Sequence, residues 1–238
     1  ADSITVAAAA NIDVGIVKAD IDIPNGASLT AFDGAIAGNA DAEATLDIEA
    51  QGTVEVRGMV SVTADAHINV DAITMVGINV TNGTFVGIAG EGIVGSANAL
   101  AELDVHSTQG PVIFSAPEVD GIAGITVSAR ADQTVGDIDM SATVLSTDGL
   151  ARFTGSANKF SDVTKAKARM LILSDESSVD LLGGADVTSL AAQTVRSVDI
   201  SGTVTAAPEG SSSAAAHFDG FNDEILGAES LRSAASID

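Results

Sequence analysis

Hydrophobic and polar residues alternate without interruption over residues 44–72, which read ATLDIEAQGTVEVRGMVSVTADAHINVDA. Every even position in this stretch is Ala, Leu, Ile, Val or Gly, and every charged residue is at an odd position. The same phase already begins at Phe32. Because the side chains of an extended chain point to opposite faces with a period of two, the pattern predicts β-strands with one buried and one solvated face.

The alternating stretch from Phe32 to Ala72 is too long to be one straight strand. At about 3.3 Å per residue it would extend for roughly 130 Å, whereas ordinary strands have about five or six residues. The chain must therefore turn while it keeps its phase. We expect the corners at glycines of the inward phase, where the missing side chain lets the backbone turn: Gly34, Gly38, Gly52 and Gly58.

Short copies of the pattern recur along the chain. They share a hydrophobic–polar–hydrophobic triplet, found as IDI 21–23, LDI 46–48, INV 68–70, LDV 103–105, IDM 138–140 and VDI 198–200. The distances between successive triplets are unequal. The sequence therefore indicates repetition without a strict period.

The alternation predicts an all-β fold, for which two architectures compete. A β-solenoid, or parallel β-helix, is favoured because stacked coils keep small inward residues in a narrow interior through their corners. The alternative is a pilin-like or jelly-roll β-sandwich with a donated N-terminal strand. Six dipeptides typical of tight hairpin turns support it: Asn25-Gly26, Asp33-Gly34, Asn82-Gly83, Asp120-Gly121, Asp148-Gly149 and Asp219-Gly220.

We expect one all-β structural domain over residues 1–206, in which residues 1–17 are the candidate exchanged or donor strand. Residues 207–238 read as a Ser/Ala-rich linker followed by a short C-terminal tail or helix, with Asn222 as its cap. The other helical signal is residues 158–172, NKFSDVTKAKARMLI, which we interpret as a solvated helix or hairpin.

Charge and composition exclude several classes of function. Ten Lys and Arg stand against 33 Asp and Glu, and the resulting net charge of −23 at pH 7 repels nucleic acid and anionic lipid. The absence of cysteine excludes disulfides and thiolate metal sites. No uninterrupted apolar stretch of about 18 residues is present, so we expect no membrane insertion.

The same composition favours a location outside the cell. An acidic, cysteine-free chain rich in Ala, Gly, Thr and Val is typical of exported proteins, so we expect an extracellular or cell-surface protein of a prokaryote. The sequence begins at Ala1 without Met, which fits removal of a leader or a fragment of a longer chain.

The stretch 44–72 and, less closely, VDISGTVTA at 198–206 resemble the repeats of filamentous-haemagglutinin-like adhesins and autotransporter passenger domains. The likeness extends over residues 40–145 and is one of sequence style, without an invariant motif. It implies a right-handed β-helix and a secreted structural or adhesive rod. The unequal repeat lengths and the basic segment at 152–169 depart from the family pattern.

Two segments are candidates for contacts between copies of the chain. Residues 3–16 carry alternate apolar positions suited to adding a strand to a neighbour's sheet edge, unless they pair as the first strand of their own chain. Half of all basic residues fall within 152–169, and this cluster suits an acidic surface on another copy. The candidate interface residues are Ile4, Val6, Ala8, Ala10, Ile12, Val14, Ile16, Arg152, Lys159, Lys165, Lys167 and Arg169.

Metal binding has one weak candidate. Asn39, Asp41 and Glu43 place oxygen ligands on alternate positions of one strand face, where they suit Ca²⁺, although a solvated acidic face is the favoured explanation. His67 and His106 lie on the wet phase without a second histidine nearby, which indicates surface residues. We expect no cofactor other than this calcium ion.

The sequence favours a structural function. Nucleophile-elbow and P-loop motifs are absent, so we expect no enzymatic activity. The leading hypothesis is an extracellular protein that self-assembles by β-strand pairing into a filament, sheath or surface layer. The alternative is an adhesin rod that binds a glycan or cell-surface protein through the loop 107–121. A polysaccharide-active β-helix enzyme, with Asp137 and Asp139 as a carboxylate pair, ranks third.

Overall fold

The structure is a computed structural model that describes residues 3–33, 36–89, 94–147, 149–156, 163–206, 215–221 and 231–237. All regular elements in these ranges are strands. They are β1 (Ile4–Ala19), β2 (Asp22–Ile23), β3 (Ser28–Asp33), β4 (Ala40–Ala50), β5 (Val54–Val56), β6 (Val60–Thr81), β7 (Thr84–Ala89), β8 (Ala97–Ser107), β9 (Val112–Phe114), β10 (Ile125–Ser146), β11 (Leu150–Ser156), β12 (Thr164–Ser174), β13 (Val179–Leu181), β14 (Ala185–Ala206), β15 (Ala215–Phe221) and β16 (Leu231–Ile237).

The strands form four sheets, which we call A to D. Sheet A has the order β1-β6-β10-β14-β16, with β2 also paired to β6; sheet B is β3-β7-β11-β15, sheet C is β4-β8-β12 and sheet D is β5-β9-β13. Every pairing between these strands is parallel. The chain visits the sheets in the order A, B, C, D in three successive passes, β1–β5, β6–β9 and β10–β13, before β14 to β16.

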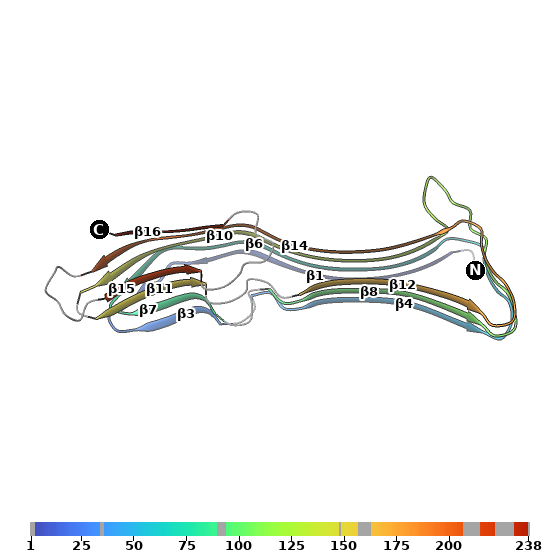
Figure 1. Ribbon diagram of the computed structural model, residues 1–238, viewed down its shortest axis with the longest axis horizontal. Helices are drawn as coiled ribbons and strands as arrows, with labels where there is room; N and C mark the ends of the chain where they lie inside the picture. The colour runs from blue at the N-terminus through green and yellow to red at the C-terminus, as the bar shows by residue number, and fades with distance from the viewer. Residues whose placement is uncertain are drawn as a thin grey trace.

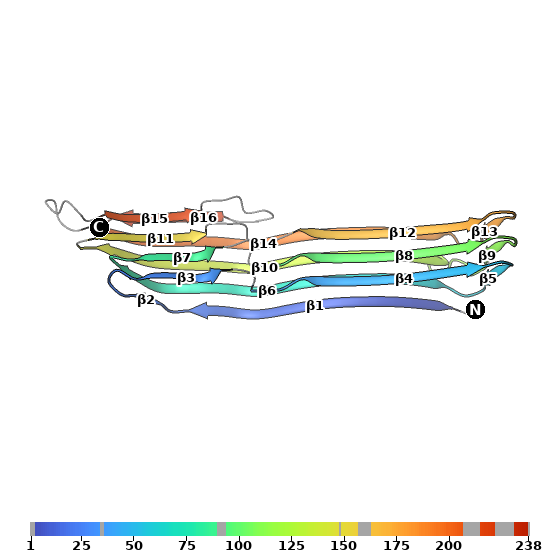
Figure 2. The ribbon, with the colours of Figure 1, turned by 90° about the horizontal axis from the view of Figure 1, so that it is seen from below.

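The passes stack on one another to give an elongated, narrow molecule. Sheet A forms one long layer, sheets B and C lie end to end in the opposite layer, and sheet D closes the end beyond sheet C (Figure 1). Seen after a quarter turn, β1 lies at one end of the stack and the later strands lie at the other (Figure 2). Parallel pairing throughout the named strands does not fit a jelly-roll or pilin-like sandwich, which is built on antiparallel pairs.

The predicted alternation is confirmed where the structure describes it. Inward residues of β4, β5 and the first part of β6 are at even positions and buried or half-buried, and the outward ones are more exposed. Register places inward residues of successive passes in columns, and one such column is Val6, Val62, Val127 and Val187. The core is therefore a set of aligned Ala, Val, Ile and Leu columns, with few aromatic side chains.

The inward phase shifts at a bend in the long strands. In β6 it passes from Val70 to Ile73, and in β10 it passes from Val135 to Ile138. Gly136 lies at this bend, and a Cβ added there would overlap the carbonyl oxygen of Asp71 in the pass below. The bend therefore depends on a backbone contact that only glycine allows at this position.

The glycine corners are confirmed in part. Gly52 and Gly58 lie in the turns that flank β5, as expected. Gly38 lies in the irregular segment before β4, and Gly34 is outside the described residues. Two of the dipeptides that suggested hairpins serve a different purpose: Asn25-Gly26 and Asn82-Gly83 are at the corners where the chain leaves sheet A for sheet B. Asp120-Gly121 does form a tight turn, between the antiparallel pair Val119 and Ile122.

The two helix predictions are wrong where the structure tests them. Residues 164–174 form β12, because pairing with β8 and an alternating inward row outweigh the helix propensity of Ala, Lys and Arg. Leu231–Ile237 form β16, which pairs with β14. Within 207–238, residues 215–221 and 231–237 form β15 and β16. Asn222 and residues 207–214 are outside the described residues, so the Ser/Ala-rich linker stays a prediction.

The unequal spacing of the repeats has a structural cause. LDI 46–48 and LDV 103–105 do lie side by side in sheet C, whereas the triplet between them, INV 68–70, belongs to sheet A. The second pass also carries an insertion, residues 115–124, where the other passes use only residues 57–59 and 182–184. This insertion projects from the corner between β9 and β10 (Figure 1).

Candidate functional site: the unpaired sheet edges

The strand β1 forms one edge of sheet A within the described chain. It pairs on one side with β6, so residues 3–16 do act as the first strand of their own chain. Inward residues from Ile4 to Val14 are only half-buried, whereas Val62 and Ile68 in the next pass are fully buried. The first pass therefore leaves an apolar row partly uncovered at this end of the stack.

Ile16 departs from the predicted row. The phase shifts after Val14, so Val17 takes the inward position and Ile16 is 58% exposed on the outer face. The other six N-terminal candidates, Ile4, Val6, Ala8, Ala10, Ile12 and Val14, all face the core.

The direction of the backbone N–H and C=O groups at the β1 edge follows from the hydrogen bonds between β1 and β6. The N–H of Ile4 donates to the Met59 carbonyl at 2.9 Å, which shows that inward residues of β1 bond toward β6. Alternate residues of a parallel strand bond to opposite sides, so the peptide groups of Thr5, Ala7 and Ala9 point to the free edge. This edge therefore presents a regular row of donors and acceptors.

At the opposite end, sheet A extends beyond sheet C. β14 lies over β10 with Ala185 level with Ile125, and β16 pairs with β14 only from Val198 onward. Residues 185–192 are exposed on both faces, and the inward Val187 is 42% exposed where Val127 below it is buried. The first half of β14 therefore forms an apolar ledge above β12.

The strand β12 is the edge of sheet C beneath this ledge. Its inward residues Ala166, Ala168, Met170 and Ile172 are half-buried. Its outward residues at alternate positions are Lys165, Lys167, Arg169, Leu171 and Leu173, all exposed.

The basic row of β12 is specific to the third pass. In register with it, β8 carries Asn98, Leu100 and Glu102, and β4 carries Asp41, Glu43 and Thr45. The outer face of sheet C therefore changes from acidic at β4 to basic at β12.

One ion pair links these rows. Lys167 Nζ lies 3.1 Å from Glu102 Oε1, whereas the side chains of Lys165 and Arg169 have no partner in the described part of the chain. Sequence reasoning grouped five basic residues, and the structure brings Lys165, Lys167 and Arg169 together. Arg152 lies on β11 in sheet B instead, and Lys159 is outside the described residues.

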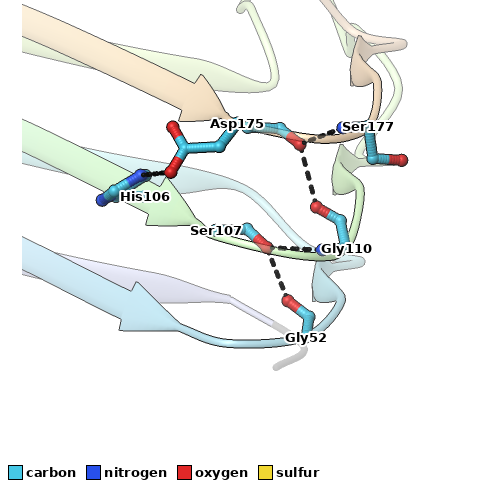
Figure 3. Close-up of polar contacts among 7 residues, drawn as sticks. Gly52, His106, Ser107, Gly110, Asp175 and Ser177 are labelled. Carbon is cyan, nitrogen blue, oxygen red and sulfur yellow. Dashed lines mark hydrogen bonds and ion pairs between the residues drawn. The ribbon is translucent and has the colours of Figure 1, made fainter.

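A serine ladder holds the corner next to the β12 edge (Figure 3). Ser107 Oγ donates to the Gly52 carbonyl at 2.7 Å and accepts the Gly110 N–H at 3.1 Å. One pass on, Ser174 Oγ donates to the Gly110 carbonyl at 3.0 Å. Because each hydroxyl bonds to the pass below, this corner fixes where β12 ends.

His106 belongs to the same corner. Its Nε2 atom lies 3.0 Å from Asp175 Oδ2, the residue after β12 (Figure 3). The histidine is half-buried and connects two passes. Its position agrees with the expected wet phase of the strand.

The calcium candidates are committed to contacts within sheet C. Asn39 Oδ1 accepts the Ser96 N–H at 2.9 Å, and Asp41 Oδ1 accepts from Asn98 Nδ2 at 2.8 Å. Glu43 is exposed on the same face. Among the described residues no three His, Asp or Glu side chains cluster closely enough to hold a metal ion, and weak calcium binding stays a prediction.

The carboxylate pair considered for catalysis lies on the outer face of sheet A. Asp137 accepts a hydrogen bond from the Ser197 hydroxyl, and Arg196 Nη1 lies 3.4 Å from its other oxygen. The hydrogen bond from Ser197, aided by the Arg196 charge, holds the pKa of Asp137 below its ordinary value. Asp137 is therefore a carboxylate held between two passes.

One buried polar residue was missed in the sequence. Gln133 lies in the column of Ile68 and Gln193, where its Nε2 donates to the Gly95 carbonyl and its Oε1 accepts from Gln193 Nε2 at 2.8 Å. The odd inward phase of β10 includes position 133, so the burial of this glutamine was readable from the sequence. Its partners were not, because they come from other passes.

The described ranges contain no helix with the length and hydropathy needed to cross a bilayer. Compared with known proteins, the chain matches no protein-family model, no curated protein and no solved structure.

Proposed function

We propose that the chain is a parallel β-solenoid that serves as an extracellular structural protein of a prokaryote. Copies join end to end by β-strand pairing into a filament, sheath or surface layer. The observation that carries this proposal is the pair of uncovered sheet A edges, β1 at one end of the stack and the first half of β14 at the other.

The hydrogen-bonding groups of the two edges are complementary. The N–H of Ile125 bonds upward to the Gly184 carbonyl at 3.3 Å, so the inward residues of β14 direct their peptide groups away from β10. On β1 the outward residues, such as Ala7 and Ala9, direct theirs away from β6. A second copy whose β1 lies on β14 therefore continues the same parallel ladder.

Side-chain columns continue across the same junction. With Ile4 of the next copy above Ala185, Val6 follows Val187 and Ala8 follows Ser189, which repeats the columns inside one chain. The free edge of β14 extends to Ser197, where β16 begins to cover it, and this length accommodates Ile4–Val14. Val17–Ala19 of the incoming β1 fall on the positions that β16 occupies, so this end of β1 must leave the ladder at the junction. Such a contact joins different surfaces, so it propagates instead of closing.

Substitution of Ala9 by proline tests this contact. Proline removes an N–H at the free edge of β1 without breaking a bond to β6. Losing one edge hydrogen bond of about 1–1.5 kcal/mol raises the protein concentration needed for assembly by about tenfold. Electron microscopy and light scattering across a concentration series measure this change, and circular dichroism verifies that the strands persist.

The matched control is Ala9→Ser, which keeps the N–H and has nearly the same size. It should assemble as the unmodified chain does. Filaments formed by Ala9→Pro at the same concentration as the control, or only monomers from the unmodified chain at high concentration, contradict the proposal.

The projecting insertion favours a second candidate function, an adhesin rod. Val119 and Ile122 pair through two backbone hydrogen bonds around Asp120 and Gly121, whose positive φ angles make a tight turn. Both apolar side chains are about half exposed, at 48% and 52%. Binding to a glycan array or cell surface that survives Val119→Ser with Ile122→Ser would remove this candidate loop.

A further inference from the structure

The free edge of β12 is a second strand-pairing position, distinct from the sheet A edges. Sheet A has four strands in this half of the molecule, β1, β6, β10 and β14, whereas sheet C has three, β4, β8 and β12. Within the described residues, one strand position above β12 is therefore uncovered, opposite the inward residues of β14. A sheet A junction between two copies would not fill it, because the next β4 would lie one strand further along.

The position is bordered by apolar groups on two sides. Ala166, Ala168, Met170 and Ile172 line it from β12, and they are half-buried against the core. Val187 lines it from β14 and is 42% exposed. An added strand with small apolar residues at alternate positions would cover both rows.

Backbone groups of β12 are ready to pair with such a strand. In sheet C, the N–H of Ala40 donates to the Ser96 carbonyl at 2.9 Å, so inward residues bond to the following pass. On β12 the same alternation directs the peptide groups of Ala166, Ala168 and Met170 to the free edge.

The positive charges on the outer face of β12 favour an incoming strand that carries acidic residues. The outer border of the position carries Lys165, Lys167 and Arg169 at alternate residues, and Lys165 and Arg169 have no partner in the described residues. Lys167 already reaches a carboxylate on the neighbouring strand, since its Nζ lies 3.1 Å from Glu102 Oε1. An acidic outward row on an incoming strand would meet the remaining cations in the same way.

We propose that the edge of β12 is an acceptor site for an extended acidic segment of another polypeptide, with small apolar residues on one face and carboxylates on the other. The segment adds to sheet C as a strand, covers the ledge of β14 and pairs its carboxylates with Lys165 and Arg169. The site depends only on this edge and does not require polymerisation.

The chain itself supplies a probe of the right pattern. Residues 40–50, ADAEATLDIEA, form β4, whose apolar residues face inward. In the register of sheet C its Asp41 and Glu43 are level with Lys165 and Lys167, and Arg169 is level with Thr45, between Glu43 and Asp47. A fluorescent peptide of this sequence is titrated with the full-length chain, and anisotropy is measured. We expect saturable binding of one peptide per chain that weakens as salt is added.

Two variants locate the binding. Lys165→Glu with Arg169→Glu should weaken it by about tenfold or more, because two attractive pairs become repulsive. Ala168→Pro should weaken it by removing an edge N–H that pairs with no described strand. The control Lys18→Glu makes one such charge reversal on β1 and should leave binding unchanged.

Two control peptides test separately whether binding needs the carboxylates and whether it needs apolar residues at alternate positions. A peptide with every carboxylate replaced by lysine, and one of unchanged composition whose apolar residues no longer alternate, should both fail to bind. Absence of binding by the acidic peptide overturns the inference, since the lysines then serve to prevent strand pairing at an exposed edge. Binding that Lys165→Glu with Arg169→Glu and Ala168→Pro leave intact overturns it as well.

The experiment is independent of the sheet A junction. Peptide binding that persists in Ala9→Pro, with no filaments from the unmodified chain, supports this site and removes the polymer. Filaments without peptide binding support the polymer and remove this site.

Discussion

Individual glycines set how closely neighbouring passes approach. Gly136 in β10 faces the Asp71 carbonyl of the pass below, and no side chain fits between them. Gly15 lies at the same bend in the first pass, yet nothing lies within 4 Å of the place its Cβ would occupy, since no pass lies beneath it. The two glycines share one position in the repeat but differ in what surrounds them.

This contrast gives a prediction for Gly136→Ala. The added methyl group must displace backbone, so we expect the free energy of unfolding to fall by about 1–3 kcal/mol. Gly15→Ala should leave it unchanged or raise it by up to about 1 kcal/mol, because alanine restricts the unfolded chain. Chemical denaturation measures both, and an equal loss in the two variants would contradict the close contact at the bend.

For individual elements, the sequence predicted which segments are strands better than it predicted which strands pair with one another. Alternation at residues 44–70 identified strands and their buried face correctly, because the period of two depends only on local geometry, whereas the phase shift at Ala72 was not predicted. The basic strand β12 also alternates, with Ala166, Ala168 and Met170 between Lys165, Lys167 and Arg169. Helix-favouring residue types hid that signal, and only pairing with β8 resolves it.

The pairing partner of each strand could not be predicted from the sequence, because it depends on where the other passes of the chain lie. The first five triplets alternate between sheets A and C, so distances from one to the next mix different columns, and only IDM 138–140 and VDI 198–200 are successive triplets that pair directly. The uncovered β12 edge was not foreseeable for the same reason. The edge is uncovered because sheet C has one strand fewer than the part of sheet A that faces it, and no local pattern of residues shows such a difference.

The strands of sheet B depend on an aromatic contact. Phe85 in β7 and Phe153 in β11 are fully buried, and their rings stack with centroids 5.5 Å apart. We expect Phe153→Ala to lower the free energy of unfolding by about 3–5 kcal/mol, because it leaves a large cavity between sheets A and B. Leu150→Ala on the same strand, where Leu150 is 50% exposed, should change it by less than about 1 kcal/mol in the same denaturation experiment.

At the scale of the whole molecule, net charge opposes assembly. Each copy carries −23, and the Debye length of about 30 Å at 0.01 M salt leaves neighbouring copies in repulsion. At 0.15 M the length is about 8 Å, so edge pairing dominates once copies touch.

End-to-end assembly should therefore strengthen as sodium chloride is raised from 10 to about 150 mM, while peptide binding at β12 weakens. Light scattering and anisotropy on the same samples compare the two responses. Assembly that declines with salt would show that opposite charges hold the copies together, in conflict with pairing between the largely uncharged β1 and β14 edges.

Parallel stacking also sets how the molecule resists force. Hydrogen bonds between passes are directed along the stack, whereas the covalent backbone of each strand lies across it (Figure 2). Tension across the stack is borne by peptide bonds, but tension along it separates one strand pair at a time, beginning at an end. The protein is therefore mechanically anisotropic: it is inextensible in one direction and can be peeled apart in the other.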